Sequence, residues 1–368
     1  MDNLSKLLII TTMLLVILAC LGSNIVFVSC EQQVTLTDSL QRSVNITIVP
    51  KRVITLAPFI TETMAYLGVD DYIIGADSIS FESWYMNIGS KLRERGVKSV
   101  GGYWWSAISV DDIIALQPDL VLAEAGAHKP LLSVLESHNI TVFYLYGGSA
   151  KSLNEVYSDI YNIGVIFNRT EDAINLINKI ENSFVETRKS LQDRGLSGLK
   201  ILIVIDFWQG IWVAGKATFL DDVLSKLGLV NAASIYGWGV VNIEQVASWN
   251  PDLILVANMT SLSNETVAAS GLYNLGKPVI ILSYNETDVL MRPGPLLTDA
   301  PTILYNAVSS ALKTGRETPT ETTSTSTAQQ ITPEAELMPQ LLIVLIPFVA
   351  LVCGLIGYYI GYKRGVKR

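Results

Sequence analysis

Cysteine and histidine are scarce in this chain of 368 residues. The three cysteines are Cys20, Cys30 and Cys353, and the two histidines are His128 and His138. The long segment between Cys30 and Cys353 therefore has no disulfide framework, no thiol nucleophile and no cysteine metal site. Two histidines are also too few for the cluster of imidazoles and carboxylates that a bare transition metal requires.

Motifs for catalysis and for nucleic-acid binding are missing as well. The sequence has no Gly-x-Ser-x-Gly elbow, no phosphate-binding loop and no His-Glu metal motif. Lys and Arg number 26 against 34 Asp and Glu, with no basic patch of the kind that binds nucleic acid. We therefore expect a protein that is not an enzyme, carries no cofactor and has no nucleic-acid partner.

Two apolar segments near the ends predict contact with a membrane. Residues 1–30 are predicted to be a signal peptide or an uncleaved signal anchor, because a lysine precedes the apolar run 7–19. Residues 341–362 carry no charge and, at about 1.5 Å per residue, are long enough to span the hydrocarbon core. The basic tail 363–368 is predicted to be cytoplasmic, which places the body outside the cell.

The segment before this anchor and the glycosylation motifs fit an outward-facing body. Residues 314–339 are rich in Thr, Ser, Pro and Glu, which predicts an O-glycosylated stalk or a plain disordered linker. Together these features predict a single-pass, membrane-anchored glycoprotein of an archaeal cell surface. We expect glycans on some of the sequons in the body, which lie at Asn45, Asn139, Asn168, Asn258, Asn264 and Asn285.

The body contains an internal repeat. Residues 110–122 are echoed by residues 243–255, which begin 133 positions later (243 against 110). Each copy has an acid at its second position, a short apolar-periodic helix, and then Pro-Asp-Leu leading into an apolar strand. Proline ends the helix because it has no N–H donor and disfavours helical geometry in the residue before it. Since the apolar run is typical of a strand buried on both faces, the repeat predicts two similar α/β lobes.

The predicted fold class is α/β, with two lobes that each contain a mainly parallel sheet flanked by helices. Lobe 1 is expected over 50–150 and lobe 2 over 196–313, with a transmembrane helix after them. The segment 151–195 has helical periodicity and no proline, and it is predicted to break into two helices. The second, roughly 170–192, would form a stiff bridge, so the lobes should move little. Its predicted apolar face consists of Ile174, Ile177, Ile180 and Phe184.

A ligand site is predicted beyond the carboxyl ends of the strands, where the loops are rich in aromatic residues. Such side chains form the walls of pockets for large, flat or amphipathic ligands. Arg292 either contacts an anionic, oxygen-rich ligand or forms a salt bridge that shapes the Pro-Gly-Pro turn. His128 is either one ligand to a chelated metal or a solvated loop residue. The predicted ligand-binding residues are Pro58, Phe59, Tyr103, Trp104, Trp105, Trp208, Trp212, Trp238, Tyr284 and Arg292.

Residues 50–313 resemble the helical-backbone (class III) substrate-binding proteins of ABC importers, and the shared motifs occur in the same order along the chain. This class includes the binding proteins for vitamin B12, ferric siderophores and haem. Stalked, C-terminally anchored forms are similar to surface binding proteins of archaea. The resemblance also includes the predicted bridging helix. Its sequence motifs are Arg52–Pro58 with Thr61-Glu62, Leu67-Gly68, Val100-Gly101-Gly102, Ile113–Leu122 and Arg292–Pro295.

The resemblance implies a monomeric extracellular protein that captures a metal chelate between its lobes. It would deliver a ferric siderophore, cobalamin or haem to a permease dimer with ATPase subunits. In the vitamin B12 member, a glutamate on each lobe pairs with permease arginines, at the positions of Asp111 and Glu244 here. Both acids could instead simply favour helix N-termini, and Asp112 could replace Asp111. An alternative function is a surface receptor or adhesin that has no permease partner.

Overall fold

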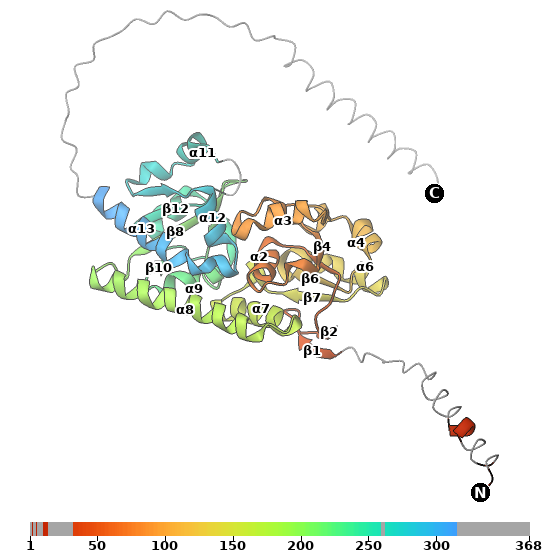
Figure 1. Ribbon diagram of the computed structural model, residues 1–368. Coiled ribbons are helices and arrows are strands. Elements are labelled where there is room, and N and C mark those ends of the chain that lie inside the picture. The colour runs from red at the N-terminus through yellow and green to blue at the C-terminus, as the bar shows by residue number, and fades with distance from the viewer. Residues whose placement is uncertain (1, 3–4, 6–9, 14–31, 259–261, 315–368) are drawn as a thin grey trace, which may run out of the picture. The chain divides into compact units, whose positions relative to one another are not determined.

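The computed structural model describes residues 2, 5, 10–13, 32–258 and 262–314, and these fall in one compact unit (Figure 1). Within these ranges no helix is both long and apolar enough to cross a membrane. The predicted membrane segment 341–362 and basic tail 363–368 lie outside the described residues, as do most of the predicted signal segment and nearly all of the predicted stalk.

The first sheet contains five parallel strands in the order β5-β4-β3-β6-β7. Every residue of its fourth strand in sequence, β6 (Leu120–Glu124), is buried, as the apolar run predicted. The other strands are β3 (Val53–Thr55), β4 (Ile73–Ala76), β5 (Lys98–Ser99) and β7 (Val142–Leu145). The helices are α2 (Pro58–Tyr66), α3 (Ile88–Glu94), α4 (Val110–Leu116), α5 (Ala125–His128) and α6 (Leu132–Ser137).

The second sheet has a parallel part and an antiparallel extension. The strands β10 (Val230–Asn231), β8 (Lys200–Asp206), β12 (Leu253–Val256) and β13 (Val279–Ile281) are parallel to one another. The antiparallel partners are β9 (Ile211–Ala214), which pairs with β8, and β11 (Trp238–Val241), which pairs with β9. The sequence analysis treated both segments as loops, which is wrong. The helices here are α9 (Phe219–Lys226), α10 (Ile243–Trp249), α11 (Asn264–Ala269), α12 (Tyr284–Met291) and α13 (Ala300–Thr314).

The internal repeat appears as two copies of the same local structure. Helices α4 and α10 end at Gln117 (φ 45°) and Asn250 (φ 48°), both in the left-handed region. Each precedes the proline of its repeat, which disfavours right-handed helical geometry there. The aspartate after that proline then accepts backbone N–H groups at the start of the neighbouring strand: Asp119 from Arg52, and Asp252 from Lys200.

The segment between the sheets forms two helices, α7 (Leu153–Ile166) and α8 (Thr170–Asp193), as predicted. Figure 1 shows them running along one side of the molecule, and α7 contacts both α2 and α9. The predicted apolar face of α8 is only partly right, because Ile174 is 43% exposed. The residues of α8 that are buried are Ala173, Leu176, Ile180, Phe184 and Leu191. This row begins at Ala173, one position before the predicted Ile174. A bridging role for α8 stays a prediction.

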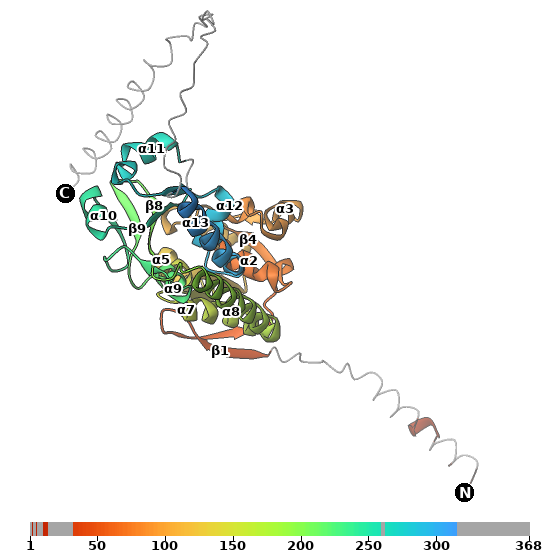
Figure 2. The ribbon, with the colours of Figure 1, turned by 90° about the vertical axis from the view of Figure 1, so that its left-hand side faces the viewer.

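The two sheets share one hydrophobic core. A single cluster of buried side chains includes Val53 and Leu120 of the first sheet together with Ile201 and Leu253 of the second. Two smaller clusters cover the other faces of the sheets. Figure 2 shows α10 and α11 on the outer side of the second sheet. A hairpin of β1 (Gln33–Thr37) and β2 (Ser43–Thr47), which the sequence analysis did not predict, precedes this fold.

Candidate functional site between the two sheets

A buried ion pair joins the two sheets. Arg292, directly after α12, donates from Nη1 to Oε1 of Glu62 on α2 at 2.5 Å. Its Nη2 lies 2.8 Å from Oδ1 of Asp288, and Trp84 Nε1 donates to the second Asp288 oxygen at 2.9 Å. The side chains of Glu62 and Arg292 are 0% and 9% exposed. Figures 1 and 2 both place α12, which follows the last strand of the second sheet, beside α3 of the first sheet.

The Pro-Gly-Pro turn after Arg292 packs directly on α2. A Cβ atom at Gly294 would lie 3.3 Å from both the Phe59 carbonyl oxygen and Thr63 Oγ1, so glycine permits the close approach. Of the two roles left open for Arg292, the structure shows the salt bridge. Burial raises the pKa of Glu62 to about 7, against the attraction of the Arg292 guanidinium.

A second contact between the sheets lies at the carboxyl ends of β6 and β7. Trp238 Nε1, on β11, donates to the carbonyl oxygen of Gly148 at 3.2 Å. Gly148 itself borders Glu124, since a Cβ atom there would lie 3.3 Å from Glu124 Oε1. Asp159 on α7 fixes the same loop by accepting the N–H groups of Tyr146 and Gly147 at 2.9 and 2.8 Å. Burial raises the pKa of Asp159 to about 8.

Tyr103, Glu124 and His128 form a linked group at this edge of the first sheet. The Tyr103 hydroxyl donates to Glu124 Oε2 in a short hydrogen bond. His128 is fully buried, its Nδ1 accepts the Glu124 backbone N–H at 3.0 Å, and its Nε2 lies 2.6 Å from the Tyr103 carbonyl oxygen. Nε2 therefore carries the proton, and neither ring nitrogen is free for a metal. Both roles considered for His128 are wrong, because it is a buried residue that holds the loop to β6.

Burial also sets the protonation of this group. It raises the pKa of Glu124 to about 7, although the hydrogen bond from Tyr103 opposes the rise. It lowers the pKa of His128 to about 4, so the imidazole is neutral at pH 7. Among the described residues, no group of three or more His, Cys, Asp and Glu side chains is placed to hold a metal ion.

The predicted ligand-binding residues separate by exposure. Trp104 (61% exposed), Trp105, Trp208 (63%) and Tyr284 lie at the surface, while Tyr103, Trp212 and Trp238 are half-buried. The ring centroids of Tyr103 and Trp104 are 5.3 Å apart, and Trp212 Nε1 donates to the Trp208 carbonyl oxygen. These contacts join Tyr103 to Trp104 beside the first sheet and Trp212 to Trp208 on the second. The remaining three, Pro58, Phe59 and Arg292, are buried and present little surface to a ligand.

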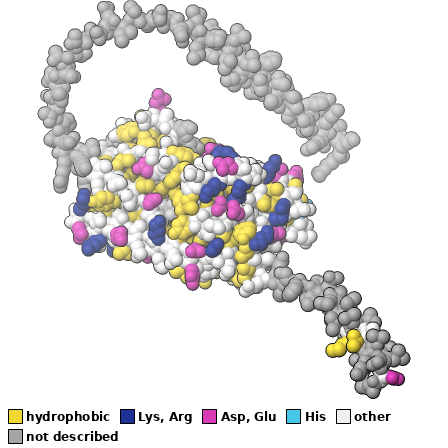
Figure 3. Space-filling view, viewed as in Figure 1, with side chains coloured by type: hydrophobic (Ala, Val, Ile, Leu, Met, Phe, Trp, Pro, Cys, Tyr) yellow, Lys and Arg dark blue, Asp and Glu magenta, His cyan; other side chains and the backbone are white. Residues whose placement is uncertain are grey.

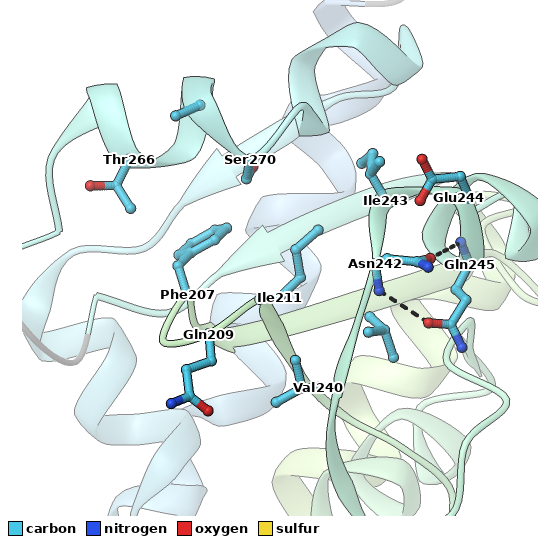
Figure 4. Close-up of a pocket in the computed structure, with 13 residues that line it drawn as sticks. Phe207, Gln209, Ile211, Val240, Asn242, Ile243, Glu244, Gln245, Thr266 and Ser270 are labelled. Carbon is cyan, nitrogen blue, oxygen red and sulfur yellow. Dashed lines mark hydrogen bonds between the residues drawn. The ribbon is translucent and has the colours of Figure 1, made fainter.

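Within the described residues, a cavity of about 650 Å³ lies on the second sheet (Figure 4). It opens between the β8–β9 turn, β11, α10 and α11, and Glu244 is one of its lining residues. Glu244 and Asp111 are both exposed, and neither has a hydrogen bond or ion pair among the described residues. Asp112, by contrast, has a carboxylate oxygen 3.9 Å from Lys98 Nζ.

Five of the six asparagines in the predicted glycosylation sequons are exposed, and Asn258 is half-buried.

The sequence analysis assigned no role to four carboxylates that the structure buries, those of Glu62, Glu124, Asp159 and Asp288. The available signal was an acid within or directly after an apolar run, as in Leu120–Glu124, where burial forces the carboxylate to find a partner. Asp288 shows no such run, and its available signal was the spacing of four residues from Arg292, which places both side chains on one face of a helix.

Two helix-flanked sheets that share a core and are connected by the helices α7 and α8 in the middle of the chain form the architecture of two-lobed solute-binding proteins. Residues 53–275, more than half of the chain, match the family described as periplasmic binding protein, and the chain belongs to this family. The family consists of solute-binding components of transport systems, which are not enzymes.

Relatives and solved structures agree with this assignment. The vitamin B12-binding protein of Pectobacterium carotovorum is 28% identical over 255 residues, which cover 67% of this chain and 84% of that protein. An uncharacterized ABC transporter substrate-binding lipoprotein of Bacillus subtilis is 26% identical over 230 residues, covering 61% and 69%. The solved petrobactin-binding protein of Bacillus subtilis has a TM-score of 0.61 at 21% identity, with coverage of 75% and 99%. At that identity the likeness concerns the fold.

We predict that Arg292→Met lowers the free energy of unfolding by about 3–5 kcal/mol, because Glu62 and Asp288 would remain buried without their cation. Arg93→Met is the control, since Arg93 and Glu82 also approach to 2.5 Å but are mostly exposed. It should cost less than about 1 kcal/mol. Urea denaturation of both variants gives the comparison, and equal losses would contradict the importance of the buried pair.

We also predict a pH dependence of stability from Glu124. Its pKa of about 7 in the folded protein exceeds the ordinary value of 4.5, so folding favours the protonated acid. This contribution is fully present below pH 4.5 and is lost as pH rises through 7. Glu124→Gln keeps an acceptor for Tyr103 and should flatten the fall in unfolding free energy over this range by up to about 3 kcal/mol. Parallel curves for the variant and the unaltered protein would refute the assignment.

Proposed function

We propose that this protein is the extracellular solute-binding component of an ABC importer. It captures a metal chelate, such as a ferric siderophore, cobalamin or haem, between its two sheets. It then delivers the chelate to a permease dimer that is driven by ATPase subunits. Support comes from membership of the periplasmic binding protein family and from relatives that bind vitamin B12 and petrobactin.

The observation that carries the proposal is the pair of exposed tryptophan groups at the carboxyl ends of strands. Trp104 and Trp105 follow β5 of the first sheet, and Trp208 follows β8 of the second. Large aromatic rings left in water are costly unless a ligand covers them, and their flat faces suit a macrocycle or an aromatic chelate. Tyr284, at the start of α12, adds a further exposed ring on the second sheet.

Docking to the permease is proposed for Asp111 and Glu244. They occupy the same position in the two copies of the repeat, and both carboxylates are exposed and unpaired. A partner with two-fold symmetry can present one cation to each of them. Asp111 is one methylene shorter than Glu244, so its reach is shorter.

For the location, we propose a monomer held at an archaeal cell surface by the C-terminal segment 341–362. The support is the uncharged run with its basic tail and the Thr/Ser-rich stretch before it. The exposed positions of Asn45, Asn139 and Asn168 suit glycans on an outward-facing body.

Titration of the purified protein with cobalamin, haem and ferric siderophores, followed by tryptophan fluorescence, tests the proposal. We expect one chelate class to bind, and Trp104→Ala and Trp208→Ala to weaken that binding about tenfold each. Tyr273→Ala removes an aromatic ring that is also 45% exposed but outside the predicted set, and it should leave the affinity unchanged. Binding of a sugar or peptide with no response to any chelate would overturn the proposed ligand class.

A further inference from the structure

The buried cation between the two sheets is already neutralised. Among the residues that the structure describes, Arg292 is the only lysine or arginine that is buried. The sequence suggested it as a contact for an anionic ligand, but its guanidinium pairs with Glu62 and Asp288 instead. Because two carboxylates already surround one guanidinium, this group has no positive charge to offer to a ligand.

Buried acids, by contrast, follow most strands of the first sheet. Asp77 comes directly after β4, and Glu124 is the last residue of β6. Glu62 lies on α2, which follows β3, and Asp159 accepts two N–H groups of the loop that follows β7. On the side of the sheets where we propose that the ligand binds, the structure therefore buries the carboxyl groups of Glu62, Asp77, Glu124, Asp159 and Asp288.

These acids respond to the charge of their surroundings. Burial raises the pKa of Asp77 to about 6 and that of Asp159 to about 8, and the Glu124 carboxylate adds to the rise at Asp159. Burial and then the negative charges of Glu124 and Asp77 raise the pKa of Tyr103. A positive charge nearby would stabilise the carboxylate forms, whereas a negative charge would oppose their ionisation. Neither protonation state of these acids attracts an anion.

Two independent features also favour a positive charge over a negative one. Glu62 Oε2 is buried and has no hydrogen-bond partner in the described part of the chain, so it is an acceptor without a donor. The exposed rings of Trp104 and Trp208 present π-faces, which attract cations. Lys129 and Lys151, in the segments after β6 and β7, are exposed, so water and salt screen their charges.

We propose that the solute of this protein carries no net negative charge and is an uncharged or cationic chelate. The inference rests on the proposed transport function and narrows its ligand class. Ferric catecholates and haem carry negative charge and are excluded by it. Hydroxamate chelates and corrinoids with amide side chains satisfy it.

The test compares charge variants of one chelate, so that its size and its metal stay constant. The first series is ferrioxamine B, which is cationic, with its uncharged N-acetyl and anionic N-succinyl derivatives. The second is cyanocobalamin with one propionamide converted to an aminoethyl amide or to a carboxylic acid. Tryptophan fluorescence of the purified protein gives the affinities, and haem is titrated alongside. In the series that binds, we expect the anionic member to bind at least about tenfold more weakly than the uncharged one.

The double variant Asp77→Asn with Glu124→Gln tests whether the buried acids cause this preference. The amides keep a hydrogen-bond acceptor for the Ser80 N–H and for the Tyr103 hydroxyl. The ratio of cationic to anionic affinity should fall at least about threefold in this variant. Glu186→Gln, at an exposed position of α8, is the control and should leave the ratio unchanged.

Three results would overturn the inference while leaving the proposed function in place. These are tighter binding of an anionic derivative than of its uncharged parent, haem as the tightest ligand, and an unchanged affinity ratio in the double variant. Failure of both series and of haem to bind would overturn the proposed function, and the inference with it.

Discussion

The buried pairing of Arg292 with Glu62 and Asp288 fixes how the two sheets meet. A guanidinium and two carboxylates taken out of water are costly unless they satisfy one another, so the network tolerates little displacement of α12 from α2. Trp84 and Ser83 extend it with hydrogen bonds to Asp288 and Glu62. The loop before α3, the α2 helix and the end of α12 are thereby held in one geometry.

The shared hydrophobic core acts in the same direction. Side chains from both sheets and from α7, α8 and α13 belong to one cluster, so separation of the sheets would expose apolar surface along their whole contact. The hydrogen bond from Trp238 to Gly148 adds a polar contact at the carboxyl edge. Outside this frame, the side chains of Trp104, Trp208, Asp111 and Glu244 are exposed, which is what the proposed roles in ligand binding and docking require.

The sequence predicted the parts of the fold that local chemistry determines. Pro118 and Pro251 end their helices through their own covalent structure, and the strands after them are apolar on both faces, so both units could be placed from residue order alone. The α7–α8 break was likewise predictable, since Asn168 adopts the left-handed conformation that asparagine tolerates.

Features that depend on distant partners could not be predicted in this way. The strands β9 and β11 pair only with each other and with β8, and their tryptophans suggested loops when read without that pairing. Arg292 and Glu62 form a salt bridge although they lie 230 positions apart in the sequence. His128 is buried, with hydrogen bonds to the Tyr103 carbonyl oxygen and to the backbone of Glu124 in β6. Trp104 and Phe59 both lie near strand ends in the sequence, but Trp104 is exposed and Phe59 is buried. This difference depends on the packing of the whole fold.

If the buried ion pairs and the shared core hold the two sheets at a fixed separation, that separation stays the same when the proposed chelate binds between them. Distances between spin labels at Glu94→Cys on α3 and Glu265→Cys on α11, with the three native cysteines replaced by serine, measure this separation directly. The mean distance should change by less than about 2 Å when a saturating chelate is added. A larger shift, or a second distance population that disappears on binding, would show that the sheets open and close and would contradict the claim.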